Sequence, residues 1–152
     1  MLPLTLQYVR FRTSLWLWAR LIPFLAWRVD LPTVLARVAP GRRMPYRGLP
    51  ARLIAYRAKR AVRRPRVMAD RPCLREGLLA NRFLRLAGYQ PEIHFGVERS
   101  SLGKQVLQAH CWIVLGGQTI LNEPRKEMIL VMLVDQHSRI LAPRPAPQAA
   151  VH

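Results

Sequence analysis

The chain has 152 residues, and its 25 basic side chains against 8 acidic ones give a net charge of +17 at pH 7. This length fits one domain with a substantial core, and a hydrophobic content of 51% excludes a disordered chain. Nearly all of the positive charge is arginine, because only Lys59, Lys104 and Lys126 are lysines. Such a charge attracts nucleic acid, acidic peptides or lipid surfaces without selecting one of them, and a GC-rich genome alone would also raise the arginine content.

The cysteines and histidines predict neither a disulfide framework nor a metal site. The two cysteines lack zinc-finger spacing, and the histidines at positions 94, 110, 137 and 152 form no ligand cluster. We therefore expect no metal and no cofactor. The apolar N-terminus is interrupted by Arg10, Arg12, Arg20 and Arg28, so it falls short of the ~20 residues of a spanning helix. We expect a soluble, cytoplasmic protein, with contact to a membrane surface left open.

The N-terminal part of the chain carries helical patterns. Residues 4–29 mix tryptophan, leucine and spaced arginines, which predicts one or two amphipathic helices, broken near Pro23 and stopped near Pro32. This segment either packs on the core or binds a membrane surface or a partner. A Pro- and Gly-rich linker at 40–50 precedes a basic helix at 51–64, which Pro65 ends. No aromatic RNA-binding signature accompanies that helix, so nucleic acid is a disfavoured partner.

A better defined helix is predicted from Cys73 to Ala87. Asp70 is placed to cap its start, Pro72 suits an early helical position, and Gly88 is a natural stop. The members of one stripe follow helical spacing, and most of them are small: Cys73, Gly77, Ala80 and Leu84. Leucines and Phe83 cover further faces, which predicts a central, buried helix that a strand can approach closely.

After Gly88 the pattern changes to the alternation typical of strands. The expected strands are residues 93–97, 106–115, 118–121, 128–134 (apolar throughout, and so buried on both faces) and 139–142. Gly116-Gly117 is a strong two-residue hairpin signal. The fold class is therefore α+β, with N-terminal helices and a central cysteine-bearing helix packed on a small antiparallel sheet. We expect a basic, apolar helical region at 1–66, a core at 67–142 and a Pro-rich tail at 143–152.

Two residues in this order have the chemistry of a cysteine enzyme. A thiol at a helix start, such as Cys73, lies at the positive end of the peptide dipole, which favours the thiolate. An imidazole on a nearby strand, such as His110, is a candidate general base. If Gly116 and Gly117 form the turn, Trp112 opposes Leu121, Cys111 opposes Asn122 and His110 opposes Glu123.

The hairpin register decides which side chain would hold His110. With the register above, Glu123 would fix the second imidazole nitrogen, as the third member of a triad does. A change of one residue would give that role to Asn122. Strand alternation also puts Cys111 on the opposite face from His110, which makes Cys111 an unfavoured nucleophile.

The segment from Arg71 to Pro124 resembles the transglutaminase-like cysteine proteases of lasso-peptide biosynthesis, of the stand-alone B2 type. The resemblance lies in Cys73-Leu74 at a helix start and in four further segments: Arg82 to Tyr89, Ile93 to Val97, Ala109 to Trp112, and Leu121 to Pro124. It implies a transglutaminase- or papain-like fold, with Cys73 as nucleophile and His110 as general base and acid. The family usually has an aspartate as third residue, where this chain offers only Asn122 and Glu123.

The resemblance also implies an activity and partners. The family removes the leader from a ribosomally made lasso precursor peptide, which frees the amine that an ATP-dependent cyclase then joins to a side chain. A small leader-binding B1 protein delivers the precursor, and here it is expected to be a separate chain. Two alternatives stay open: an inactive or acyl-transferring protein of the transglutaminase fold, and a basic nucleic-acid-binding accessory protein.

Overall fold

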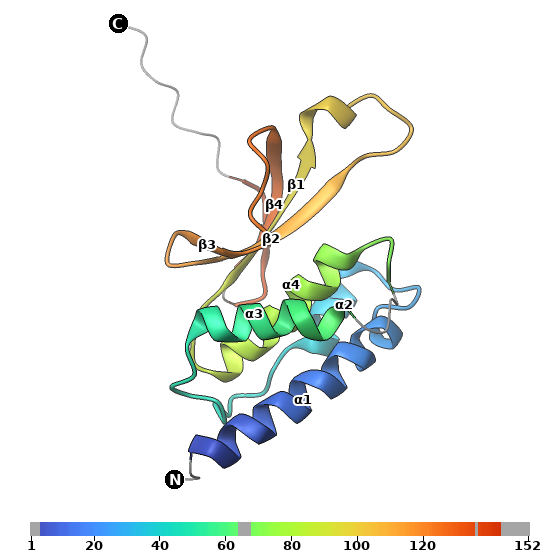
Figure 1. Cartoon of the computed structure of the whole chain (residues 1–152). Helices are drawn as coiled ribbons and strands as arrows, with labels where there is room; N and C mark the ends of the chain where they lie inside the picture. Colours follow the sequence, from blue (N-terminus) through green and yellow to red (C-terminus); the bar gives the residue numbers. More distant parts are fainter. Residues whose placement is uncertain (1–3, 64–67, 136, 144–152) are drawn as a thin grey trace, which may run out of the picture.

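In the computed structural model, helices cover one side of an antiparallel sheet (Figure 1). The structure describes residues 4–63, 68–135 and 137–143. The helices are α1 (Leu4–Leu25), α2 (Leu31–Val38), α3 (Ala51–Val62) and α4 (Pro72–Leu86), with a short 3-10 helix at Arg99–Ser101. The strands are β1 (Glu92–Glu98), β2 (Ala109–Leu115), β3 (Gln118–Leu121), β4 (Met128–Val134) and β5 (Ile140–Leu141). This confirms the α+β class.

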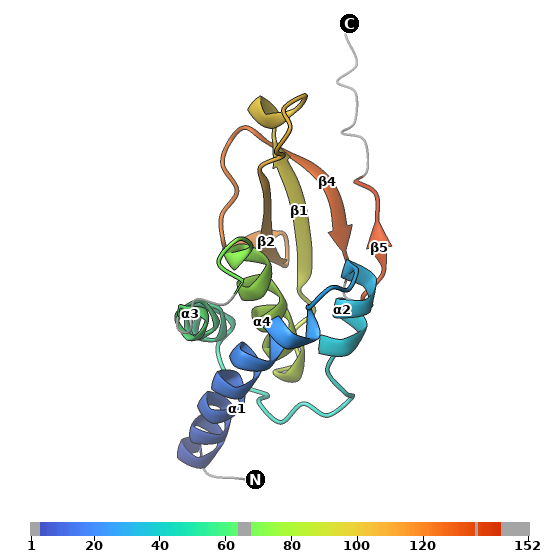
Figure 2. The ribbon, with the colours of Figure 1, turned by 90° about the vertical axis from the view of Figure 1, so that its right-hand side faces the viewer.

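Helix α4 is the central element. It contacts the other three helices on one side and strands β2 and β1 on the other. The sheet has the order β3-β2-β1-β4-β5, and every neighbouring pair is antiparallel. Leu78, Leu79 and Phe83 of α4 are fully buried in the one large hydrophobic cluster of the described residues, as predicted for a helix with apolar side chains on several faces. Figure 2 shows α4 between the sheet and α1.

Helix α1 continues through Pro23 because a side chain of another helix replaces the hydrogen bond that the proline cannot make. Proline has no N–H, so Ala19, one turn earlier, loses the donor for its carbonyl. The Arg75 guanidinium of α4 fills this gap: its Nε donates to the Ala19 carbonyl at 3.0 Å, and its Nη2 also contacts that oxygen. The same side chain donates from Nη1 to the carbonyl of Val62, the last residue of α3, at 3.1 Å. The fully buried Arg75 therefore joins three helices.

Arginines also cap the C-termini of α1 and α2. Arg37 Nη1 donates to the carbonyl of Leu25, the last residue of α1, at 3.0 Å. Arg82 Nη1 donates to the carbonyls of Val38 and Ala39 at the end of α2, at 2.8 and 2.9 Å. A helix C-terminus carries unpaired carbonyls and partial negative charge, which a guanidinium satisfies well. Part of the arginine excess is thus structural.

Two helix boundaries differ from the sequence-based expectation. Pro32 does not stop a helix but sits in the first turn of α2, which we did not predict, and the Asp30 side chain accepts from the backbone N–H of Thr33 at 3.0 Å. At α4 the predicted cap by Asp70 is wrong. The N-cap residue is Arg71, without a side-chain cap, and Asp70 forms an ion pair with the Arg71 side chain at 3.0 Å instead.

The strands also depart from expectation at three places. β2 begins at Ala109, not at residue 106. β4 is only half-buried, with Val131 45% exposed, because α4 covers β2 and β1. Leu115 pairs with Gln118 as predicted, but a bulge follows, so that Ile113 pairs with Leu121. The β5 strand lies within its predicted range, whereas Pro65 and residues 144–152 of the predicted tail lie outside the described residues.

Within the described residues, no helix combines the length and the apolar character that crossing a bilayer requires.

Candidate active site

Cys73 is the second residue of α4, where backbone N–H groups lack helical partners. Pro72 precedes it at the first helical position, where a backbone N–H would have no intrahelical partner, and proline has no N–H. The thiol is only partly buried, whereas the other cysteine, Cys111, is 1% exposed. A half-exposed thiol at the positive end of a helix has the setting of a reactive cysteine.

The surroundings of Cys73 favour its thiolate. Hydrogen bonding from the Cys111 thiol lowers the pKa of Cys73 most, and the Cys111 backbone and the His110 side chain lower it further. Burial opposes these effects, and the resulting pKa of Cys73 is about 5. These surroundings therefore favour loss of the Cys73 proton at neutral pH.

Cys111 lies beside Cys73 because the helix face there has a glycine, which leaves room for the strand. A Cβ atom on Gly77, one turn after Cys73 on α4, would lie 3.1 Å from the Cys111 Sγ. The small-residue stripe therefore does let β2 approach, as predicted. Hydrogen bonding to Cys73 and burial raise the pKa of Cys111 well above its usual value. Cys111 thus keeps its proton, which suits a hydrogen-bond donor and not a nucleophile.

His110 is held on β2 by a backbone carbonyl. Its Nε2 lies 3.0 Å from the carbonyl oxygen of Asn122. Because a carbonyl only accepts, Nε2 must carry the hydrogen, which leaves Nδ1 as the nitrogen that takes up or releases a proton. The indole of Trp112 stacks on the imidazole, with 6.3 Å between ring centroids and 23° between planes. Tautomer and orientation of His110 are both fixed.

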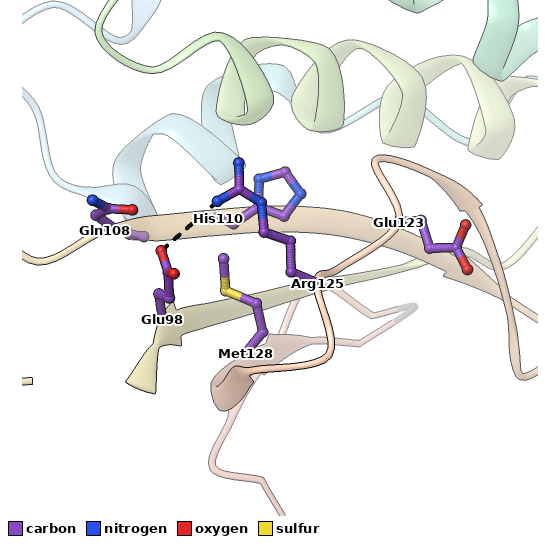
Figure 3. A pocket seen from close by; sticks show the side chains of 7 residues that line it. Glu98, Gln108, His110, Glu123, Arg125 and Met128 are labelled. Carbon is purple, nitrogen blue, oxygen red and sulfur yellow. Dashed lines mark ion pairs between the residues drawn. The ribbon is translucent and has the colours of Figure 1, made fainter. Parts of the chain in front are cut away.

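The bulge in the hairpin explains which residue reaches His110. Beyond Ile113 the pairing is shifted by one residue, so the predicted pairing of His110 with Glu123 is wrong. Asn122 follows β3 in the left-handed backbone conformation, with φ 56°, which turns its carbonyl toward the imidazole. Figure 3 shows the Glu123 carboxylate directed away from the His110 ring. Neither the Glu123 nor the Asn122 side chain makes the expected bond; the Asn122 backbone does.

Two residues that we did not predict support this segment. Lys59 Nζ of α3 donates to the Asn122 side-chain oxygen at 3.3 Å. Burial raises the pKa of Glu76 on α4, while the nearby Asn122 amide and the charge of Lys59 oppose this. Glu76 follows Cys73 by three residues, a spacing that puts both on one helix face and that was visible in the sequence.

A cavity of about 200 Å³ opens next to His110. It lies at the ends of β1 and β2 and in the loop before β4, and its lining comprises Glu98, Gln108, Ala109, His110, Glu123, Arg125 and Met128 (Figure 3). Arg125 Nη1 and Glu98 Oε2 lie 3.9 Å apart across it. The cavity is polar, close to the imidazole, and large enough for one side chain of a bound peptide. In the part of the chain that the structure describes, no three His, Cys, Asp or Glu residues are grouped to bind a metal.

Comparison with known proteins assigns the chain at the level of the superfamily. A family model described as the transglutaminase-like superfamily matches residues 17–134, from within α1 to the end of β4. No curated protein and no solved structure matches the chain. The match covers most of the chain and includes both Cys73 and His110. The chain therefore belongs to the transglutaminase-like superfamily.

Proposed function

We propose that this protein is a cysteine peptidase that removes the leader from a lasso-peptide precursor. The observation that carries the proposal is the meeting of a low-pKa thiol, Cys73, with an imidazole, His110, whose outer nitrogen is fixed by the Asn122 carbonyl. Superfamily membership supports a cysteine peptidase or an acyltransferase. The motifs around Cys73, Phe95 and His110 support the leader peptidase among these.

The chemistry would proceed through a thioester. The Cys73 thiolate attacks the carbonyl carbon at the leader–core junction, and the resulting oxyanion is stabilised by the Cys73 backbone N–H at the start of α4. His110 Nδ1, which takes up the Cys73 proton when the thiolate forms, donates that proton to the departing amine of the core peptide as the C–N bond breaks. A water molecule, deprotonated at the same nitrogen, then attacks the thioester and releases the leader as a carboxylic acid. Cys73 leaves as the thiolate.

The proposal includes partners. Residues 4–63 form helices α1, α2 and α3, which offer no strand edge to a leader peptide. A separate leader-binding B1 protein is therefore proposed to present the precursor, and an ATP-dependent cyclase to consume the amine product. The cavity beside His110 is the proposed site for a residue flanking the scissile bond.

Intact-mass analysis of a lasso precursor, incubated with this protein and the leader-binding partner, tests the proposal. The wild type should split the precursor at the leader–core junction, and Cys73→Ala and His110→Ala should lower the rate by at least about a hundredfold, as expected when a nucleophile or a general base is lost. His137→Ala, which removes an exposed histidine from the turn before β5, should cleave normally.

The same experiment separates the alternatives. When the experiment is performed in ¹⁸O-labelled water, hydrolysis adds one heavy oxygen to the leader. Acyl transfer to an added amine instead gives a leader amide without the label. Cleavage by Cys73→Ala at the wild-type rate would contradict the assignment of the nucleophile. A leader that appears only as an amide would replace the peptidase with an acyltransferase.

A further inference from the structure

The outer face of α1 carries large apolar side chains that nothing in the described structure covers. One face of the helix is buried in the core through Phe11, Leu15, Ala19 and Ile22. The opposite face is exposed along its whole length: Leu6 48%, Val9 58%, Trp16 51%, Leu17 54%, Leu21 43%, Phe24 72%, and Trp27 66% in the following turn. From Leu6 to Phe24 this outer face extends about 27 Å at the ~1.5 Å rise per residue of an α-helix.

Arginines are interspersed among these apolar side chains. Arg10, Arg12, Arg20 and Arg28 belong to the same stretch, and the sequence has no acidic residue before Asp30. The Arg20 guanidinium lies 3.5 Å above the centre of the Trp16 ring and also donates to the Trp16 carbonyl. The outer face of α1 is therefore apolar and cationic at once, without compensating negative charge.

A basic hollow borders this face. Between α1 and α3 lies a cavity of about 210 Å³, lined by Arg12, Leu15, Trp16, Arg57, Arg60 and Ala61. A second shallow cavity, of about 320 Å³, shares Arg12 and Trp16 with it. Three arginines thus line one small hollow next to a tryptophan, a setting whose positive charge attracts anionic groups such as phosphate.

We propose that the outer face of α1 lies in the surface of an anionic phospholipid bilayer. Trp16, Phe24 and Trp27 would enter the boundary between headgroups and acyl chains, while the arginines extend to the headgroup phosphates. Because no described helix has the length and apolar character to cross a bilayer, the helix lies along the surface and does not span it. The proposal does not depend on the peptidase assignment.

Charge favours this occupant over a protein. The core of a protein–protein interface is depleted in charge, which collects at the rim. On α1, Arg10, Arg12 and Arg20 lie among the exposed apolar side chains and not only at a rim. A second copy is disfavoured as well, because a two-fold contact would bring two arginine-rich faces together without an acidic residue between them.

Bilayer binding would leave the candidate active site accessible. In both views α1 lies at the edge of the molecule away from the sheet (Figure 1, Figure 2). Cys73 and His110 lie at the junction of α4 with β2, on the sheet side of the helices. A protein bound in this way would present its site to the aqueous phase.

Sedimentation with vesicles tests the proposal. The full-length protein should bind vesicles of phosphatidylglycerol and phosphatidylcholine, and bind pure phosphatidylcholine at least about tenfold more weakly, because anionic headgroups attract arginine. Added salt should weaken the binding without abolishing it, since salt screens charges but not inserted apolar side chains. Blue-shifted tryptophan emission should accompany binding.

Matched double variants locate the surface. Phe24→Glu/Trp27→Glu places two charges at the end of α1 and in the turn that follows it. Val106→Glu/Leu107→Glu places the same two charges on an exposed loop before β2, where the side chains are 75% and 54% exposed. The α1 variant should bind the anionic vesicles at least about tenfold more weakly than the loop variant. Equal binding by the two variants, or no binding by the wild type, would overturn the proposal. Circular dichroism of both variants checks that they fold.

Discussion

At the scale of single residues, a backbone carbonyl occupies the position where a triad usually has a side chain. The Asn122 carbonyl accepts from His110 Nε2 at 3.0 Å and thereby fixes the tautomer that leaves Nδ1 available. An acidic side chain would add charge stabilisation of the imidazolium, which a carbonyl supplies only through its dipole. The arrangement depends on the conformation of Asn122, with φ 56°, more than on its amide.

Two substitutions of Asn122 distinguish the role of its backbone conformation from the role of its side chain. Both Asn122→Gly and Asn122→Val lose the hydrogen bond to Lys59, but only glycine adopts a positive φ without strain. Asn122→Gly should therefore keep peptidase activity within about threefold, whereas Asn122→Val should lose at least about tenfold through a displaced His110. Glu123→Gln should remain active, and steady-state cleavage rates give all three results. A large loss in Asn122→Gly would instead assign the role to the amide.

The low pKa of Cys73 can be measured without a substrate. Alkylation by iodoacetamide follows the thiolate, so its rate should rise through a pKa of about 5 and stay constant at neutral pH. Cys111→Ala removes the hydrogen bond that lowers this pKa most, so the midpoint should move upward, toward the ~8.5 of a free cysteine. Cys111→Ser keeps a donor and should move it less. A midpoint unchanged in Cys111→Ala would exclude Cys111 as the donor.

At the scale of helices and strands, arginine side chains complete backbone hydrogen bonding that the helices leave open. Arg75 is the central case, because it satisfies the Ala19 carbonyl that Pro23 orphans and the C-terminal carbonyl of Val62. Loss of one partner leaves a buried carbonyl unsatisfied, which costs about 1–3 kcal/mol per group.

Arg75→Leu should therefore lower the free energy of unfolding by about 2–4 kcal/mol, because two carbonyls are orphaned at once. Urea denaturation measures this change. The matched control is Arg52→Leu on α3, where the arginine is exposed and the loss should stay within about 0.5 kcal/mol. Equal stability of Arg75→Leu and the wild type would mean that water satisfies these carbonyls as well.

The helix and strand patterns predicted most elements but not the features that depend on distant partners. Cys73 at a helix start and the Gly116-Gly117 hairpin follow from local residue types, and both are present. A proline can follow the end of one helix or occupy the first turn of the next, so Pro32 alone does not place the boundary. The Asp30 side chain caps α2 and thereby shows that Pro32 belongs to its first turn. The continuous apolar run of β4 looks fully buried, yet α4 covers other strands.

The candidate site divides in the same way. The positions of Cys73 at a helix start and of His110 on a strand were predictable from the local pattern. The group that accepts the hydrogen bond from His110 could not be predicted. A bulge between Ile113 and Val114 shifts the hairpin register after its correctly predicted start. Glu76 shares a helix face with Cys73, but its proximity to Asn122 depends on the packing of α4 against the hairpin.

At the scale of the whole molecule, the arginines behind the charge of +17 fall into two groups. Buried and partly buried arginines of α4 bind the backbone of other helices, while those along α1 and α3 are exposed or partly exposed. From the sequence alone, both groups of arginines indicate only an attraction for anions. The structure separates them by burial, and leaves the α1 group as the proposed contact with an anionic bilayer.

The most direct test of the account traps the proposed thioester. Hydroxylamine, added while the protein and the leader-binding partner turn over a lasso precursor, intercepts a thioester and converts the leader into its hydroxamate, which mass spectrometry distinguishes from the free acid. The account predicts a leader hydroxamate from the wild type and from His137→Ala, and neither hydroxamate nor cleavage from Cys73→Ala. Cleavage that yields only the free acid and survives Cys73→Ala would contradict a Cys73 nucleophile.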